Sequence, residues 1–333
     1  MLHKNNGYKI DYCLLGHLLG PFMKFIKLTF LLFLLNSFSQ QDPMATLASQ
    51  LSNEDLSMVD MIDYAKSHTK TDLEKAKLFY YWIGQNIKYD YELLERMSSN
   101  NFNTDEYLYN DSPEMVFDNK LAVCQGYAVL YKWFLSEFDI FCTVVSGHIR
   151  DQRNHYIELE KDDSFRHAWN IIEMNDDWMI VDSTWGTSLN ANKASYYFDI
   201  PPQQAIITHY PAKVQWQLLD GHLSLEEFNK SQYIDPLWFM NGFEKQPSLK
   251  TDHEYYYFVY QTNPNKEWQV SLEVSHDNST FAPIADAQTI EQDEFTYIRF
   301  ERNQIPKIAF FKVNLLHVNS LGESVYTIKD IIN

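Results

Sequence analysis

The chain has 333 residues, of which 45% are hydrophobic and 16% aromatic, enough apolar material for one large or two ordinary domains. This composition excludes a disordered protein. Its 45 acidic and 27 basic side chains give a formal net charge of −18, and no cluster of Lys and Arg could follow a phosphate backbone. Nucleic acid is therefore not an expected partner, whereas an acidic surface favours a basic substrate.

Residues 1–39 predict a leader. After Met23, two lysines precede the apolar run LTFLLFLL, and the small residues Ser37 and Ser39 follow it, which is typical of a secretory signal peptide cleaved near Ser39. We expect translation to start at Met23, because the preceding residues resemble neither a signal nor a domain. The run is shorter than the ~20 apolar residues of a spanning helix, so no stable membrane insertion is expected. The protein should be secreted or periplasmic.

Three helices are predicted beyond the leader, over residues 44–66, 71–88 and 124–138. The second begins with Thr71 and has a glutamate three residues later, the pattern of a capping box. The third is nearly all apolar and should be buried. Residues 97–112 are rich in Asn, Ser, Asp and Tyr without a period, which predicts a surface loop.

Short strands are predicted after these helices. They cover residues 141–149, 155–160, 165–173 and 177–185. This order predicts an α+β fold in which an antiparallel sheet packs on the long helix. Residues 194–240 close this domain, which we place at 44–240. From about Lys245, alternating segments separated by Asn, Pro, Asp and Gly turns predict a small β-sandwich domain over 245–333.

The stretch HAWNIIEMNDDWMIVD predicts a hairpin with a two-residue turn at Asn175 and Asp176, two residue types that tolerate positive φ. Each strand carries one polar residue that a buried strand should avoid, His167 and Asp182. The expected register pairs Glu173 with Trp178 and Ile171 with Ile180. His167 and Asp182 are then diagonal neighbours on one face. A loop of odd length would place them on opposite faces.

Cys124 is the residue that such a pair could activate. A carboxylate bonded to one imidazole nitrogen fixes the tautomer and supports the imidazolium, which makes a histidine a useful base. Cys124 stands at the first turn of the predicted buried helix, where the helix dipole and unpaired N–H groups favour a thiolate and can face an oxyanion. Trp169 and Trp185 are expected to wall the site. Nucleophile, base and orienting carboxylate follow in the order Cys124, His167 and Asp182.

Three motifs, VCQGYA at 123–128, HAWN at 167–170 and VDSTWG at 181–186, resemble the transglutaminase-like superfamily of papain-type cysteine enzymes. The separations of 43 residues from Cys to His and 15 from His to Asp suit this family. Four further stretches resemble its kyphoscoliosis-peptidase branch: YYF at 196–198, HYP at 209–211, WQLL at 216–219 and LEEF at 225–228. The resemblance covers about residues 50–240.

The resemblance implies a papain- or transglutaminase-like core, in which a nucleophile helix packs on an antiparallel sheet. It also implies acyl transfer on protein or peptide amides: peptide hydrolysis, Gln deamidation or Gln–Lys crosslinking. Cys124 would be the nucleophile, His167 the general base and then acid, and Asp182 the orienting carboxylate. The N–H of Cys124 is one expected oxyanion donor, and no cofactor or metal is expected. Ala122 stands where many members have Gly, which bears on the turn more than on the chemistry.

Alternatives to this interpretation remain open. The chain could be a non-catalytic transglutaminase-like scaffold or protein-binding module that keeps the fold without the chemistry. A disulfide between Cys124 and Cys142 would make the nucleophile inert; we interpret Cys142 as a core residue. His148, His155 and Asp151 suggest a metal site only through their proximity in sequence, because their spacing matches no zinc pattern.

The leader hypothesis predicts that the protein from its native host begins at Gln40, after the peptidase has removed residues 1–39. N-terminal sequencing checks this. A chain that begins before Gln40 contradicts cleavage at this position.

Overall fold

The computed structural model describes the greater part of the chain beyond the predicted leader. The described residues are 42–97, 111–151, 157–161, 167–187, 189, 191–262, 268–277, 279–305 and 309–317, with the backbone of 323–330. The leader at 1–39, most of the predicted loop at 97–112 and His155 lie outside them. Within these residues, the helices are too short or too polar for any of them to cross a membrane.

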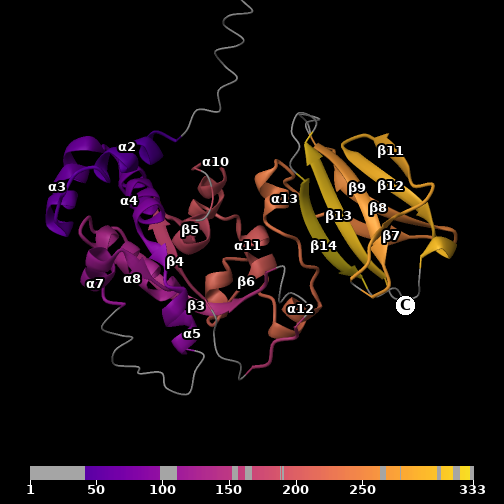
Figure 1. The fold of residues 1–333 in the computed structure, drawn as a ribbon, viewed down its shortest axis with the longest axis horizontal. Coiled ribbons are helices and arrows are strands. Elements are labelled where there is room, and N and C mark those ends of the chain that lie inside the picture. Colours follow the sequence, from indigo (N-terminus) through magenta and orange to yellow (C-terminus); the bar gives the residue numbers. More distant parts are fainter. Residues whose placement is uncertain are drawn as a thin grey trace, which may run out of the picture. The chain divides into compact units, whose positions relative to one another are not determined.

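The chain between Pro43 and Ser136 is mainly helical (Figure 1). Its helices are α2 (Pro43–Leu51), α3 (Met58–His68), α4 (Asp72–Asn86), α5 (Tyr91–Met97), α7 (Pro113–Asn119) and α8 (Cys124–Ser136). The predicted helices at 71–88 and 124–138 correspond to α4 and α8, whereas α5 and α7 were not predicted. The predicted capping box is confirmed, because the Glu74 N–H donates to Thr71 Oγ1 and the Glu74 carboxylate accepts the Thr71 N–H. The prediction of one helix over 44–66 was wrong. Ser57 accepts the Asp60 N–H and starts a second helix there.

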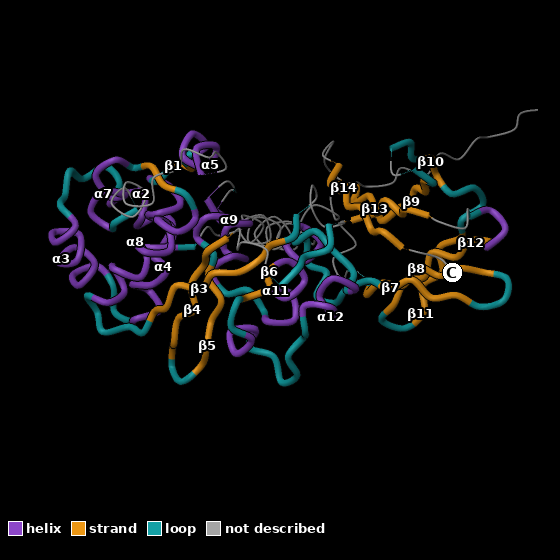
Figure 2. Tube along the Cα trace, turned by 90° about the horizontal axis from the view of Figure 1, so that it is seen from below, coloured by secondary structure: helices purple, strands orange, loops and turns teal. Residues whose placement is uncertain are grey.

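The central sheet has the strand order β5-β4-β3-β6, with every neighbouring pair antiparallel. Its strands are β3 (Cys142–Ile149), β4 (His167–Met174), β5 (Asp177–Val181) and β6 (His209–Pro211). Helix α8 lies against β3 and β4, and Figure 2 shows these strands running beside α8 and α4. Phe134 of α8 stacks on Phe79 of α4 with ring centroids 4.1 Å apart, in the main hydrophobic core. The predicted antiparallel sheet on a buried long helix is confirmed.

The turn between β4 and β5 has the predicted geometry. Asn175 and Asp176 have φ values of 54° and 67°, as a two-residue turn of this kind requires. The predicted register is confirmed, with Glu173 opposite Trp178 and Ile171 opposite Ile180. However, β5 ends at Val181 rather than at 185, because the next residues form the short helix α9 (Ser183–Thr187). The strand predicted over 155–160 is absent from its described part, 157–160.

A series of short elements returns the chain from α9 to the sheet and beyond it. They are α10 (Ala191–Ala194), η1 (Ser195–Phe198), α11 (Pro202–Thr208), η2 (Val214–Gln217), α12 (Leu225–Lys230) and α13 (Leu237–Met240). Ser224 caps α12, which contains the LEEF stretch at 225–228. The return places β6 beside β3, at the edge of the central sheet.

The remaining chain forms two four-stranded antiparallel sheets, ordered β11-β12-β8-β7 and β10-β9-β13-β14. The strands are β7 (Ser248–Thr251), β8 (Tyr255–Gln261), β9 (Trp268–Ser275), β10 (Ala282–Pro283), β11 (Gln288–Gln292), β12 (Phe295–Glu301), β13 (Ala309–His317) and β14 (Glu323–Asp330), with the short η3 (Arg302–Gln304) after β12. Phe258 and Phe300 of one sheet share a hydrophobic cluster with Phe311 of the other. The consecutive strands after Lys245 agree with the predicted alternating segments, and the sandwich arrangement stays a prediction.

Gly147 of β3 lies where β6 and a tryptophan approach the strand closely. A Cβ there would overlap the carbonyl oxygen of Tyr210 on β6 and would lie 2.6 Å from a ring carbon of Trp169. Because the overlapped atom belongs to the backbone of a paired strand, a side chain at this position would have to displace β6.

Gly147→Ala should lower the free energy of unfolding by about 1–3 kcal/mol, because overpacking forces β6 and Trp169 apart. Gly221→Ala is the control, since a Cβ at Gly221 meets no atom within 4 Å. Urea unfolding of both variants and the wild type measures the difference. Equal stability of the two variants would contradict the close approach of β6.

Candidate active site

Cys124 begins helix α8 and is partly exposed. Strand β2 (Leu121–Ala122) leads into it and pairs in parallel with β1 (Lys88–Tyr89). The N-cap residue Val123 makes no side-chain hydrogen bond to the first turn, so no cap side chain competes for its N–H groups. Cys124 and Cys142 are both free thiols. Burial raises the pKa of Cys142 to about 12, in agreement with a core residue.

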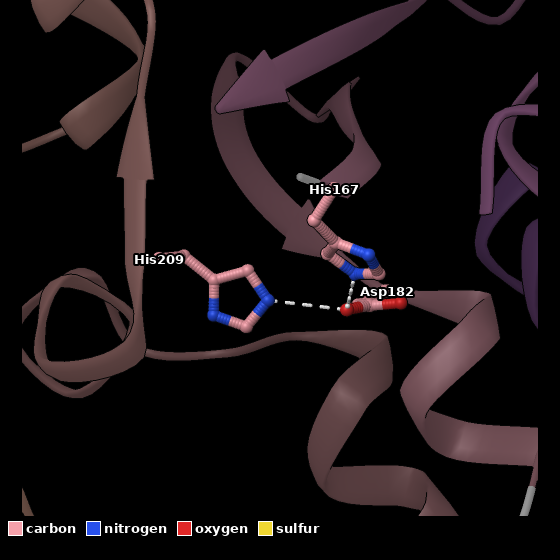
Figure 3. Close-up of side chains that lie close together, drawn as sticks. All are labelled: His167, Asp182 and His209. Carbon is pink, nitrogen blue, oxygen red and sulfur yellow. Dashed lines mark hydrogen bonds and ion pairs between the residues drawn. The ribbon is translucent and has the colours of Figure 1, made fainter. Parts of the chain in front are cut away.

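His167 and Asp182 meet in the interior, as the two-residue turn predicts. His167 is the first residue of β4 and Asp182 follows the last residue of β5. His167 Nε2 lies 2.7 Å from Asp182 Oδ2, and both side chains are buried (Figure 3). The Trp185 N–H donates to Asp182 Oδ1 over 3.0 Å, so the same carboxylate caps α9.

His167 and Asp182 each shift the pKa of the other in favour of its charged form. Burial by itself lowers the pKa of His167, but the negative charge and hydrogen bond of Asp182 outweigh it, and the pKa of His167 is raised. Burial likewise raises the pKa of Asp182, yet His167 and the neighbouring His209 hold that pKa well below its usual range. An imidazolium beside a carboxylate is therefore the favoured state.

Asp182 occupies only one nitrogen of the His167 ring. Nε2 is hydrogen-bonded to Asp182, and Figure 3 shows the other ring nitrogen, Nδ1, pointing away from that carboxylate. After burial and Asp182, Cys124 also contributes to the pKa of His167 and raises it. Asp182 and Cys124 therefore both act on the imidazole of His167.

His209 and Tyr89 are two site residues that the sequence analysis did not assign a role. His209 Nε2 lies 3.1 Å from Asp182 Oδ2, and burial lowers the pKa of this histidine, so it is neutral. Tyr89 of β1 is half-buried close to Cys124, and its pKa is raised by burial first and by Cys124 next. The stretch HYP at 209–211 contains His209, but no spacing rule links it to Asp182.

The predicted positions of Trp169 and Trp185 beside His167 are confirmed. The Trp185 ring lies 5.5 Å from the ring of His167 and 4.7 Å from that of His209, centroid to centroid. The Trp169 ring lies 6.0 Å and 5.0 Å from the same two rings. Both imidazoles are therefore enclosed by aromatic surface, which removes competing water from the hydrogen bonds to Asp182.

His167, Asp182 and His209 are also the one group of three side chains within the described part of the chain that could hold a metal ion. His148 and Asp151 belong to no such group there. The 2.7 Å between His167 Nε2 and Asp182 Oδ2 is a hydrogen-bond length. Two ligands of a tetrahedral zinc ion would stand about 3.3–3.5 Å apart, given zinc–ligand bonds of ~2.0–2.1 Å. Hydrogen bonds therefore account for this cluster.

Comparison with known proteins identifies the class to which this fold and site belong. Residues 61–183 match the family model of the transglutaminase-like superfamily, and this segment contains Cys124, His167 and Asp182. The chain therefore contains a transglutaminase-like domain, and the curated proteins that it matches include kyphoscoliosis peptidase, hillarin and a LIM and transglutaminase domain protein.

Two curated relatives illustrate the similarity. Kyphoscoliosis peptidase of Mus musculus is 27% identical over 216 residues, which is 62% of this chain and 31% of that protein. Hillarin of Drosophila melanogaster is 24% identical over 215 residues, 59% of this chain and 25% of that protein. The match thus spans about a third or less of the length of these relatives. A solved structure described as a crystal structure of a TGase aligns with a TM-score of 0.30 and 15% identity, covering 49% of this chain and 37% of that one.

Asp182→Asn should lower the free energy of unfolding at pH 7 by about 3–5 kcal/mol, because it removes the charge that compensates a buried imidazolium. The pKa of Asp182 is lower in the folded state than the ~3.9 of an unfolded chain, so its contribution is present above about pH 4. Below that pH the unfolded chain takes up the proton first, and the contribution is lost.

The gap between wild type and Asp182→Asn should therefore narrow as the pH falls below about 4, and urea unfolding between pH 7 and pH 3 measures it. Asp63→Asn is the control, since that carboxylate is exposed on α3. A gap that stays constant with pH would show that Asp182 contributes no ionised pair.

Proposed function

We propose that the chain is a cysteine-dependent enzyme for acyl transfer on protein or peptide amides, with Cys124 as nucleophile, His167 as acid and base, and Asp182 as orienting carboxylate. The observation that carries the proposal is the His167 ring, which is hydrogen-bonded through Nε2 to Asp182 and whose pKa is raised by Asp182 and then by Cys124. The similarity to a protein named kyphoscoliosis peptidase supports a peptide amide as the substrate.

The first half of the reaction forms an acyl-enzyme. The Cys124 thiolate attacks the carbonyl carbon of the amide, and the N–H groups at the start of α8 donate to the oxyanion. His167 then gives its proton to the amine, and the carbon–nitrogen bond breaks. The products of this half are a free amine and a thioester on Cys124.

The second half releases the acyl group. A water molecule or an amine transfers a proton to His167 as it attacks the thioester, and the carbon–sulfur bond breaks. The thiolate and the imidazolium are then restored. Water gives hydrolysis or Gln deamidation, and a Lys amine gives a crosslink, so the same residues serve all three reactions.

Two finer parts of the proposal concern the rest of the chain. We propose that residues 245–333 form a β-sandwich that presents or docks the substrate, which the shared hydrophobic cluster of the two sheets supports. We also propose that the leader directs the protein out of the cytoplasm, which the pattern of its apolar run supports. The net charge of −18 favours a basic protein or peptide as the substrate.

Alkylation of Cys124 by iodoacetamide tests the proposal. Because the thiolate is the reactive form, Cys124 should react about 10-fold faster than N-acetylcysteine at pH 6.5, where a free thiol with a pKa of ~8.5 is almost fully protonated. His167→Ala should move the profile toward that of a free thiol. Peptide mass spectrometry reads the rate, with buried Cys142 as internal control.

An alkylation profile like that of a free thiol, or no reaction in the folded protein, would overturn the proposed enzymatic function and favour a non-catalytic binding module. Once a substrate is found, Cys124→Ala should abolish amide cleavage or transfer without loss of folding. Partner binding that survives in this variant would separate docking from chemistry.

A further inference from the structure

The backbone of His209 is held from two sides. Its N–H donates to the Ala205 carbonyl at the end of α11, and the residue pairs with Ile149 of β3 through the edge strand β6. Gly147 allows β6 to approach β3 this closely. The imidazole of His209 is therefore placed at the carboxylate by elements that belong to neither strand of the hairpin.

The carboxylate of Asp182 accepts three N–H groups. Oδ2 accepts from Nε2 of both His167 and His209, over 2.7 Å and 3.1 Å, and Oδ1 accepts from the Trp185 backbone over 3.0 Å. Figure 3 shows the two imidazoles meeting the same oxygen from different sides. A carboxylate that can rotate about two side-chain bonds is thereby held by donors on three separate segments of the chain.

The tautomer of His209 follows from its two neighbours. An ionised carboxylate only accepts hydrogen bonds, so the proton of His209 resides on Nε2. The ring is neutral, which leaves Nδ1 as an acceptor, and the Thr208 hydroxyl lies 2.8 Å from it. The Ala205 carbonyl oxygen lies farther from the Thr208 hydroxyl, at 3.4 Å, so the hydroxyl donates to Nδ1 and selects the Nε2–H form.

His209 contributes this hydrogen bond without adding a charge. The charged groups that act on it within the described residues are Asp182 and His167. Tyr80 and Tyr197 also lie near Asp182, but burial keeps both phenols neutral by raising their pKa. A second cation would oppose the imidazolium of His167, whereas a neutral donor stabilises the carboxylate alone.

We propose that His209 is a positioning residue of the site: as a neutral Nε2–H donor it holds the Asp182 carboxylate toward His167, and so keeps Nδ1 of His167 aimed at Cys124. The proposal rests on the proposed function, because its purpose is to orient the base of the triad. Without His209, Oδ2 loses one of its two donors and the carboxylate can rotate away from the His167 ring.

Two matched pairs of variants test this role through the pH profile of Cys124 alkylation by iodoacetamide. His209→Ala removes the donor, and His209→Gln keeps an N–H donor at about the position of Nε2. Thr208→Val removes the hydroxyl that selects the tautomer, and Thr208→Ser keeps it. We expect alkylation at pH 6.5 to fall about 10-fold in His209→Ala, and about 3-fold in Thr208→Val. His209→Gln and Thr208→Ser should stay within about 2-fold of wild type.

A second measurement separates positioning from packing and needs no substrate. NMR of the full chain with ¹⁵N-labelled histidine reports the tautomer and charge of each ring. His209 should be a neutral Nε2–H tautomer, and the imidazolium signal of His167 should weaken at pH 7 in His209→Ala but persist in His209→Gln. If His209→Ala does not fold, the Gln variant and the Thr208 pair decide the question.

The outcomes distinguish this proposal from the proposed function. A wild-type alkylation profile for Cys124 like that of a free thiol overturns the proposed enzymatic function, whatever the variants do. An activated wild-type profile that His209→Ala and Thr208→Val leave unchanged overturns only the role of His209. Equal loss in His209→Gln and His209→Ala overturns it as well, because packing rather than the donor would then matter.

Discussion

The structure around the site depends on one buried charge, the carboxylate of Asp182. It is fully buried and stays ionised, a state that would be costly without compensation. Compensation comes from the imidazolium of His167, the neutral N–H of His209 and the first turn of α9. Because a half-satisfied polar network is worse than an apolar core, these partners have to be present together.

The fold is arranged so that these partners come from separate segments that pack against one another. Helix α8 lies on β3 and β4, which brings Cys124 and His167 together although 43 residues separate them. The left-handed pair Asn175 and Asp176 sets the register that puts Asp182 beside His167. Such rigid supports let a site keep its geometry to within a fraction of an ångström. The acyl transfer proposed for this site would need that precision, since the thiol and the base have to share a proton before substrate arrives.

Much of this arrangement was predictable because it rests on local rules. The capping box at Thr71 and the turn at Asn175 and Asp176 depend on residues only a few positions apart, and both are confirmed. The length of this turn fixes which residues of the hairpin share a face. The contact between His167 and Asp182 therefore followed from counting residues along the two strands. The errors also have local causes. Ser57 starts a new helix inside a segment with continuous helical spacing, and Asp182 leaves its strand to cap α9.

The amino-acid sequence by itself determined the hairpin and the contact between His167 and Asp182, since turn length and strand alternation are local rules. Only the tertiary structure decided that His209 and His167 share one carboxylate oxygen. His209 follows Asp182 by 27 residues and reaches it through an edge strand whose approach requires a glycine on β3. No periodicity or turn rule spans such a path, because its closure depends on how α11, β6 and β3 pack around the same carboxylate.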